Sequence, residues 1–209
     1  MDSLFRFLRG FPIVIVCCIT ASQAGCNRAH FISNVQSSAD SDTQVFDNAL
    51  VGTWVTFEDN KPCFLVTLNR KDRSSADYTI RLHAADRQET PEEWSGVMRL
   101  LKIGDHQFAE VEESFKSDTP RNEEIKINGK VVSKAYTLFR VLHDADTLQV
   151  WGFDGPNAIR EIATTDSVSE VSWQGMTSIV DCPPEAFQKL LLKHGHKMSM
   201  KADDFTRLK

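Results

Sequence analysis

The chain has 209 residues, of which 41% are hydrophobic and 9% aromatic, and its formal net charge is −5. This length and composition are typical of one globular domain with a substantial core, and they exclude a chain that is disordered throughout. The acidic balance and the lack of any cluster of Lys and Arg argue against nucleic-acid binding, which requires concentrated positive charge.

Residues 1–25 have the three-part form of a secretory signal peptide. Arg6 and Arg9 supply positive charge, residues 11–20 form an apolar run, and small residues are frequent at 21–25. The apolar run is about half as long as a membrane-spanning helix needs to be. We therefore expect this segment to direct export and not to span the membrane.

Cys26 follows Ala24-Gly25 and resembles the lipidated cysteine of the bacterial lipobox. The resemblance implies that Cys26 is acylated and holds the protein to a membrane through its acyl chains. Asn27 at the next position implies outer-membrane sorting, facing the periplasm, if the host is Gram-negative. The alternative is simple cleavage after Ala24, which would release a soluble secreted or periplasmic protein.

Residues 26–48 are rich in Ser, Asp, Gln, Asn and Thr and contain few large apolar residues. Such a segment buries too little surface to offset the entropy lost on ordering. We therefore predict a flexible tether between the membrane and a folded domain at 49–209.

The chain contains five cysteines, of which Cys17 and Cys18 belong to the signal peptide. If Cys26 carries lipid, Cys63 and Cys182 remain as a pair. In an oxidising envelope these two could form a disulfide. The alternative is a pair of buried thiols, and the separation of the two Cα atoms distinguishes the two cases.

From residue 50 onward, apolar and polar residues alternate with the period of two that is typical of strands. The first strand is expected at 50–57, and the clearest alternation lies at 77–84. Asn128-Gly129 between alternating runs predicts a hairpin with a two-residue turn. Further strands are expected at 63–68, 97–103, 107–115, 135–143, 147–153, 168–173 and 176–180, with a short extended segment at 198–208.

One helix is expected at 183–194. Its two prolines suit a first turn, and Glu185 there complements the helix dipole. Phe187, Leu190 and Leu191 share one face. Together, these elements predict a mainly β fold, an antiparallel barrel or a strongly curled sheet with the C-terminal helix packed on it.

Two charged patterns lie within the predicted strands. Glu110 and Glu112 share one strand face, and we interpret them as exposed charges and not as a catalytic pair. Arg140 lies among apolar residues on its own strand face. We interpret it as an edge or barrel-mouth residue with a buried stem and a solvated head.

Gly52-Thr53-Trp54, on the first strand, resembles the Gly-x-Trp motif of lipocalin-like (calycin) barrels. In those barrels the Trp closes one end beneath an arginine from near the end of the chain. The resemblance therefore implies that Gly52, Trp54 and Arg207 close the barrel of this protein.

The run from Leu50 to Arg207 also resembles a group of uncharacterised bacterial lipoproteins. The resemblance lies in the Leu-x-Gly-x-Trp start, in strands like residues 138–141 and 146–151, and in a late amphipathic helix followed by Phe-x-Arg. These are packing motifs. The group has no established catalytic residues, so the resemblance implies a fold and no activity.

We find no motif of a serine hydrolase, a zinc peptidase or a phosphate-binding loop in the sequence. His194 and His196, followed by Asp203-Asp204, are not interpreted as metal ligands, because residues two apart on a helix point to different faces. A histidine at a helix C-terminus has a simple electrostatic explanation. We therefore expect no cofactor, no metal and no enzyme activity.

The function expected from these observations is a lipid-anchored binding or accessory module of the cell envelope, which holds a small apolar ligand or a protein partner. The alternative is a purely structural envelope lipoprotein whose barrel is filled by its own side chains. A large apolar cavity would favour the first. An enzyme is the third alternative and would require a buried titratable cluster at the barrel mouth.

Overall fold

The structure is a computed structural model and describes residues 31–33, 42–84, 94–114, 126–127, 130–131, 134–152, 161–162, 166, 169–173, 177–181, 183–197 and 200–209. The predicted signal peptide at 1–25, Cys26 and Cys182 lie outside these residues. Within them, no helix has the length and apolar character needed to cross a membrane.

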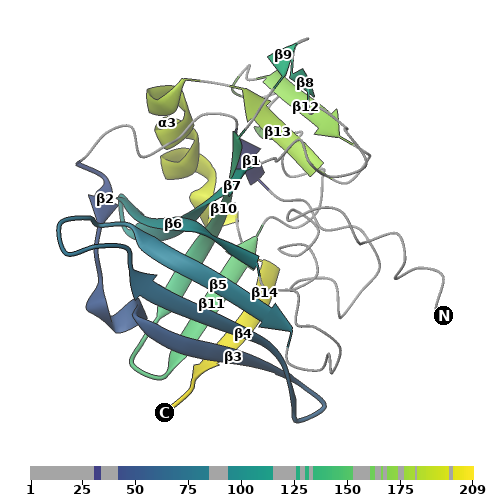
Figure 1. Ribbon diagram of the computed structural model, residues 1–209. Coiled ribbons are helices and arrows are strands. Elements are labelled where there is room, and N and C mark those ends of the chain that lie inside the picture. Colours follow the sequence, from purple (N-terminus) through teal and green to yellow (C-terminus); the bar gives the residue numbers. More distant parts are fainter. Residues whose placement is uncertain are drawn as a thin grey trace.

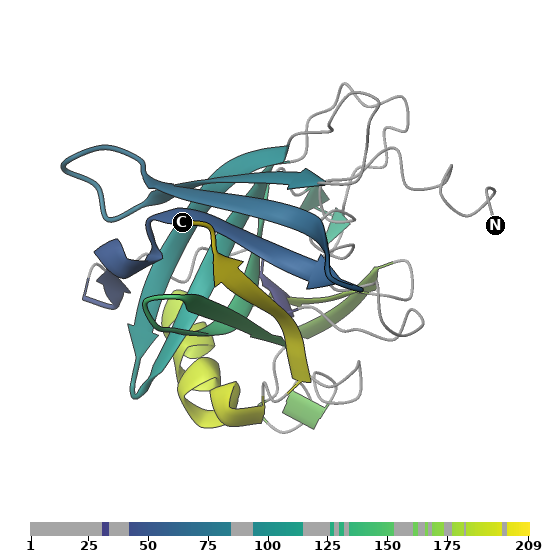
Figure 2. The same ribbon diagram turned by 90° about the horizontal axis from the view of Figure 1, so that it is seen from below.

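Eight antiparallel strands form a closed barrel (Figures 1 and 2). Each strand pairs with the next one in the barrel, and the last strand pairs back onto the first, so the barrel wall has no open edge. This confirms the mainly β prediction in its barrel form. The strands are β3 (Gly52–Glu58), β4 (Lys61–Arg70), β5 (Tyr78–Ala84), β6 (Trp94–Ile103), β7 (His106–Ser114), β10 (Lys134–His143), β11 (Thr147–Gly152) and β14 (Met200–Arg207).

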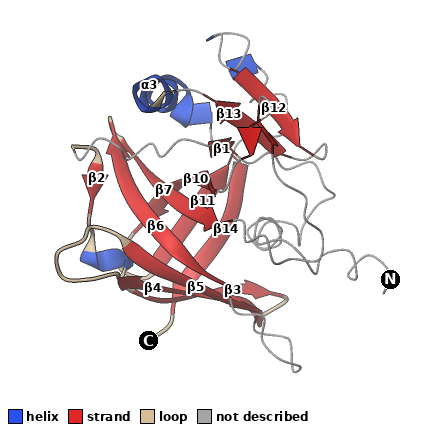
Figure 3. Cartoon of the chain, turned by 45° about the horizontal axis from the view of Figure 1, so that its top comes forward, coloured by secondary structure: helices blue, strands red, loops and turns tan. Residues whose placement is uncertain are grey.

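A side layer leaves the barrel at β10 (Figure 3). One edge of β10 is shared: residues 136–138 pair with β1 (Phe31–Ser33), whereas residues 140–143 pair with β11. β1 in turn pairs in parallel with β13 (Thr177–Asp181), which pairs with β12 (Ser169–Trp173). β10 is therefore a fork at which the barrel wall and the side layer separate. A separate hairpin joins β8 (Lys126–Ile127) to β9 (Lys130–Val131), on either side of the predicted turn at 128–129.

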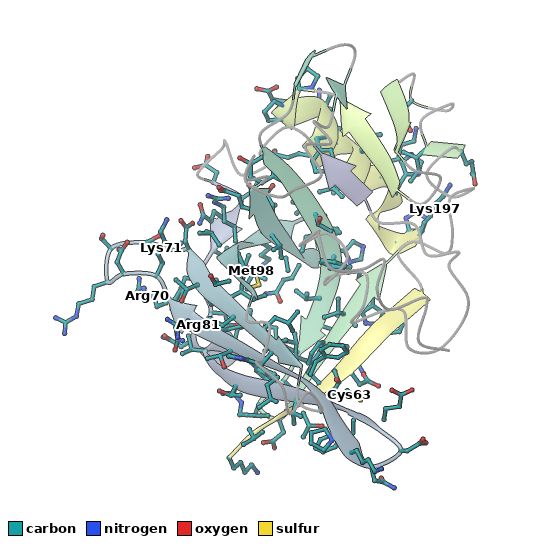
Figure 4. The ribbon with its side chains drawn as sticks, turned by 45° about the vertical axis from the view of Figure 1, so that its right-hand side comes forward. Cys63, Arg70, Lys71, Arg81, Met98 and Lys197 are labelled. Atoms are coloured by element: carbon teal, nitrogen blue, oxygen red, sulfur yellow. The ribbon has the colours of Figure 1, made fainter. Side chains whose placement is uncertain are left out.

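Alternate residues of the barrel strands face inward and form the main hydrophobic core. Trp54, Tyr78 and Leu100 are fully buried there, and Phe139 and Val141 of β10 join them. Figure 4 shows Met98 among these inward-facing side chains, while Arg81 lies on the exposed face of β5. The alternation of inward apolar and outward polar residues in β5 is the one predicted for residues 77–84.

The helix α3 (Pro184–His194) packs on the outside of the barrel wall and is followed by the short helix η4 (Gly195–Lys197). Its apolar face forms a second core with outward-facing residues of β6, β7 and β10. This confirms the predicted helix and its buried face. The second core consists of Leu101, Ile103, Phe108, Leu138, Ile162, Phe187, Leu190 and Leu191.

The structure corrects the boundary of the predicted tether at 26–48. Its described C-terminal part, residues 42–48, belongs to the domain, because β2 (Gln44–Val45) pairs with β6. Phe46 stacks on Tyr78 with 4.9 Å between ring centroids. The polar composition of this segment predicted no ordered structure. Its few apolar residues nevertheless pack against the barrel core. β1 adds a further paired strand inside the predicted tether.

We predict that Phe187→Ala lowers the free energy of unfolding by about 3–5 kcal/mol, because it removes a fully buried ring between α3 and the barrel wall. Leu192 lies on the same helix with 59% of its surface exposed, and Leu192→Ala should change that free energy by less than about 0.5 kcal/mol. Urea unfolding of the purified chain measures both. Equal losses in the two variants would contradict the docking of α3.

Candidate functional site

Trp54 closes one end of the barrel, beneath Arg207. The indole is fully buried, and its Nε1 donates a hydrogen bond to the carbonyl of Leu50 at 2.9 Å. The guanidinium carbon of Arg207 lies 4.3 Å from the centroid of the Trp54 ring. This is the contact that the Gly-x-Trp resemblance implies. Leu50 ends the short helix η3 (Asn48–Leu50), which crosses this end of the barrel.

Arg207 also binds three backbone carbonyls around the closed end. Its Nη1 donates to Val51 at 2.9 Å, its Nε donates to Ala145 at 2.6 Å, and its Nη2 donates to Ala49. Gly52 provides the room for this approach, since a Cβ at that position would lie 2.8 Å from Nη1. Its φ of +149° also disfavours other residues. The three predicted barrel-closing residues therefore lie together.

Asp47 organises a second set of contacts at the closed end. Its side chain accepts a hydrogen bond from the Ala49 backbone at 2.8 Å and caps η3, and it lies 3.5 Å from Nε2 of His143. The Tyr78 hydroxyl donates to the Asp47 carbonyl at 3.0 Å and accepts from the Asp47 amide at 2.7 Å. Burial raises the pKa of Tyr78, which therefore stays a neutral donor. Asp47 was not among the predicted site residues, although an Asp just before a helix is a known capping signal.

The barrel interior is apolar but not uniformly buried. Leu68, Leu82 and Leu148 are at most 6% exposed. Phe64 and Val150 belong to the same inward-facing set, packed against the core, yet each keeps solvent-exposed surface. Ile80 on β5 behaves in the same way. Part of the inner wall is therefore accessible, and its accessible side chains are hydrocarbon.

An ion-pair network lies on the outer wall and corrects the interpretation of Glu110 as exposed. Glu110 is fully buried, and its carboxylate lies 3.7 Å from the guanidinium of Arg99, which is 8% exposed. Arg99 also lies 3.3 Å from Glu112 and 3.4 Å from Asp77. Antiparallel pairing sets Arg99 opposite Glu110. A cross-strand pair of this kind is invisible in a one-dimensional pattern, which explains the error.

His194 forms a close pair with Asp166 and not with His196. Its Nε2 lies 2.6 Å from Asp166, which Lys193 also contacts at 2.6 Å. The hydrogen bond from Lys193 is the main cause that lowers the pKa of Asp166, followed by the one from His194. His196 is exposed. In the described part of the chain, no group of three His, Cys, Asp or Glu residues could hold a metal ion.

Cys63 lies near the turn between β3 and β4. Its sulfur is 3.6 Å from the Glu58 carboxylate and 3.8 Å from the Lys61 carbonyl. Because Cys182 lies outside the described residues, the disulfide remains a prediction. The same holds for lipid on Cys26.

Comparison with protein families, with curated proteins and with solved structures found no match. The architecture itself, a closed barrel of eight antiparallel strands, is compatible with ligand binding and with a lipocalin-like fold. The function must therefore be argued from the geometry of this chain.

We predict that Arg207→Ala lowers the free energy of unfolding by about 2–4 kcal/mol, because it removes the stack on Trp54 and leaves three carbonyls without their donor. Arg73, in the exposed turn between β4 and β5, is the matched control. Arg73→Ala should change the same free energy by less than about 0.5 kcal/mol. Chemical denaturation followed by tryptophan fluorescence would measure both, and an unaffected Arg207→Ala protein would refute the role in barrel closure.

Proposed function

We propose that this protein is a lipid-anchored module of the bacterial cell envelope that holds a small apolar ligand inside its barrel. The observation that carries the proposal is the accessible surface of the inward-facing Phe64, Ile80 and Val150. These residues are less buried than Leu68, Leu82 and Leu148 of the same core. An eight-stranded barrel is of a size that can hold one small ligand.

The chemistry of the inner wall supports an apolar ligand. The described ion pairs of β4 to β7 lie on the outer wall, as those around Arg99 do. The two buried polar residues that face inward away from the closed end are Thr56 and Thr137, among the residues with described burial. A charged ligand would lose its hydration in such an interior without gaining a counterion. Hydrocarbon would gain by burial there.

A purely structural role is the second candidate, and the closed end favours it. Trp54, Tyr78, Leu68 and Leu100 are fully or almost fully buried, so this part of the barrel is filled by side chains. In that case the module would serve the envelope through its fold or through a protein partner. The proposal includes no catalysis and no cofactor.

Filling the accessible part of the interior should separate the two candidates. Ile80→Phe adds volume inside the barrel, whereas Thr79→Phe adds the same ring on the outer face of β5. We predict that a small apolar molecule accompanies the protein from its own host in native mass spectrometry. Ile80→Phe should reduce its occupancy at least about fivefold, since overfilled sites exclude ligands, and Thr79→Phe should not change it.

The same measurement can contradict ligand binding. A chain that emerges from its host without any small molecule, in detergents known to preserve lipid complexes, would favour the structural candidate. Co-purification of a protein at fixed stoichiometry would favour the partner form of the hypothesis.

The anchoring part of the proposal rests on Cys26. We predict that Cys26→Ser moves the protein from the membrane fraction to the soluble fraction, because the residue that would carry the acyl chains is lost. Cys63→Ser is the matched control and should leave the fractionation unchanged. Immunoblots of separated fractions from the native host measure both variants, and a Cys26→Ser protein that stays with the membrane would end the lipoprotein hypothesis.

A further inference from the structure

Arg140 and Trp151 stand directly opposite each other on the outer wall of the barrel. Arg140 lies between Phe139 and Val141, which both face the barrel core, so its own side chain points outward. Trp151 shares this face because it is the register partner of Arg140. Side chains of opposed residues in an antiparallel pair lie within reach of each other.

Each of these side chains carries a buried N–H without an acceptor. Nε of Arg140 and Nε1 of Trp151 are both buried, and neither finds a hydrogen-bond partner within the described ranges. The nearest described carboxylate on the same face, Glu110 of β7, lies 3.7 Å from Arg99, and no described salt bridge includes Arg140.

Unpaired buried donors are rare in native proteins, and an exception points to a bound water or ion. Both groups can only donate, and one of them carries a full positive charge. Arg140 as a whole is partly buried, so the group that lacks a partner is its Nε–H. The partner that would satisfy the pair is therefore an acceptor that carries negative charge.

The pair lies at the fork of β10, where the barrel wall and the side layer separate. Arg140–Trp151 is the outermost pair of the ladder between β10 and β11, and the next residues of the same β10 edge pair with β1. The described ladders do not join β1 to β11. Figure 3 shows the two strands beside β10 as members of different layers.

We propose that Arg140 and Trp151 bind the carboxylate of a small organic acid that has an apolar chain. A single guanidinium balances one negative charge, which matches a carboxylate, whereas a phosphate monoester carries more than one at neutral pH. The surroundings suit the apolar chain. Leu142, the next outward-facing residue of β10, is 43% exposed.

This site lies outside the barrel, so it stands independently of the ligand proposed for the interior. Octanoate is a suitable probe, with acetate, octanol and inorganic phosphate as the comparison arms, in calorimetric titrations of the purified full-length chain. Octanoate should bind at one saturable site. Acetate should bind more weakly because it lacks the chain, and octanol and phosphate should bind more weakly because they lack the matching charge.

Two variants and two controls test the assignment of residues. Arg140→Gln should weaken octanoate binding by about tenfold or more, and Trp151→Phe by a few fold, because the first removes the charge and the second removes one donor. Arg73→Gln, in the exposed turn after β4, is the control and should leave the affinity unchanged. Ile80→Phe fills the barrel interior and should also leave it unchanged.

Stability without ligand supplies a second readout. Arg140→Gln should not lower the urea midpoint, because it removes a buried Nε–H that has no described hydrogen-bond partner. The proposal is overturned if Arg140→Gln leaves octanoate binding intact, if phosphate binds more tightly than octanoate, or if Arg140→Gln lowers the midpoint. Octanoate binding that Ile80→Phe abolishes and Arg140→Gln does not would place the acid inside the barrel, which supports the interior ligand and refutes the outer site.

Discussion

The stack of Arg207 on Trp54 joins the first and last strands of the barrel, because the two residues are register partners on β14 and β3. The hydrogen bonds of Arg207 reach Val51 and Ala49, which precede it by 156 and 158 residues. A closed antiparallel wall has no unpaired edge through which it could aggregate. It forms only when the first and last strands of the barrel pair with each other. Closure of so long a loop loses chain entropy. The buried indole and the three carbonyl contacts offset this loss at one point.

The parts of the fold that depend on local pattern could be predicted from the sequence. Period-two alternation located the barrel strands, and the i, i+3, i+4 spacing of Phe187, Leu190 and Leu191 located the helix and its buried face. The role of Arg207 was implied by resemblance alone. No local rule connects residue 207 with residue 54, because their contact depends on the pairing of β14 with β3.

What could not be predicted depends on pairing between strands. Glu110 was predicted to be exposed because charged residues on strands usually are, yet cross-strand neighbours bury it beside Arg99. Likewise, no sequence signature in β1 or β11 predicts that both strands pair with the same edge of β10. Residues 42–48 joined the domain because Val45 and Phe46 found a core that their own composition does not reveal. In each case a tertiary contact outweighed a local propensity.

Next to the fork, β10 carries an apolar side chain on one face and a charged side chain on the other. Phe139 and Arg140 are adjacent, yet the first packs in the barrel core and the second points to the outer wall. Alternation makes this separation obligatory: every inward apolar residue is followed by an outward one, and the outward one must find its own partner. Where the helix α3 covers the wall, the outward-facing residues Leu138 and Phe108 pack against the helix. Where the two layers diverge, Arg140 has Phe108 and Trp151 as cross-strand neighbours, and neither accepts a hydrogen bond from its Nε. Where a side layer separates from the barrel wall, polar groups at the fork are therefore left without partners in the described part of the chain. A ligand of opposite charge is the simplest way to satisfy them.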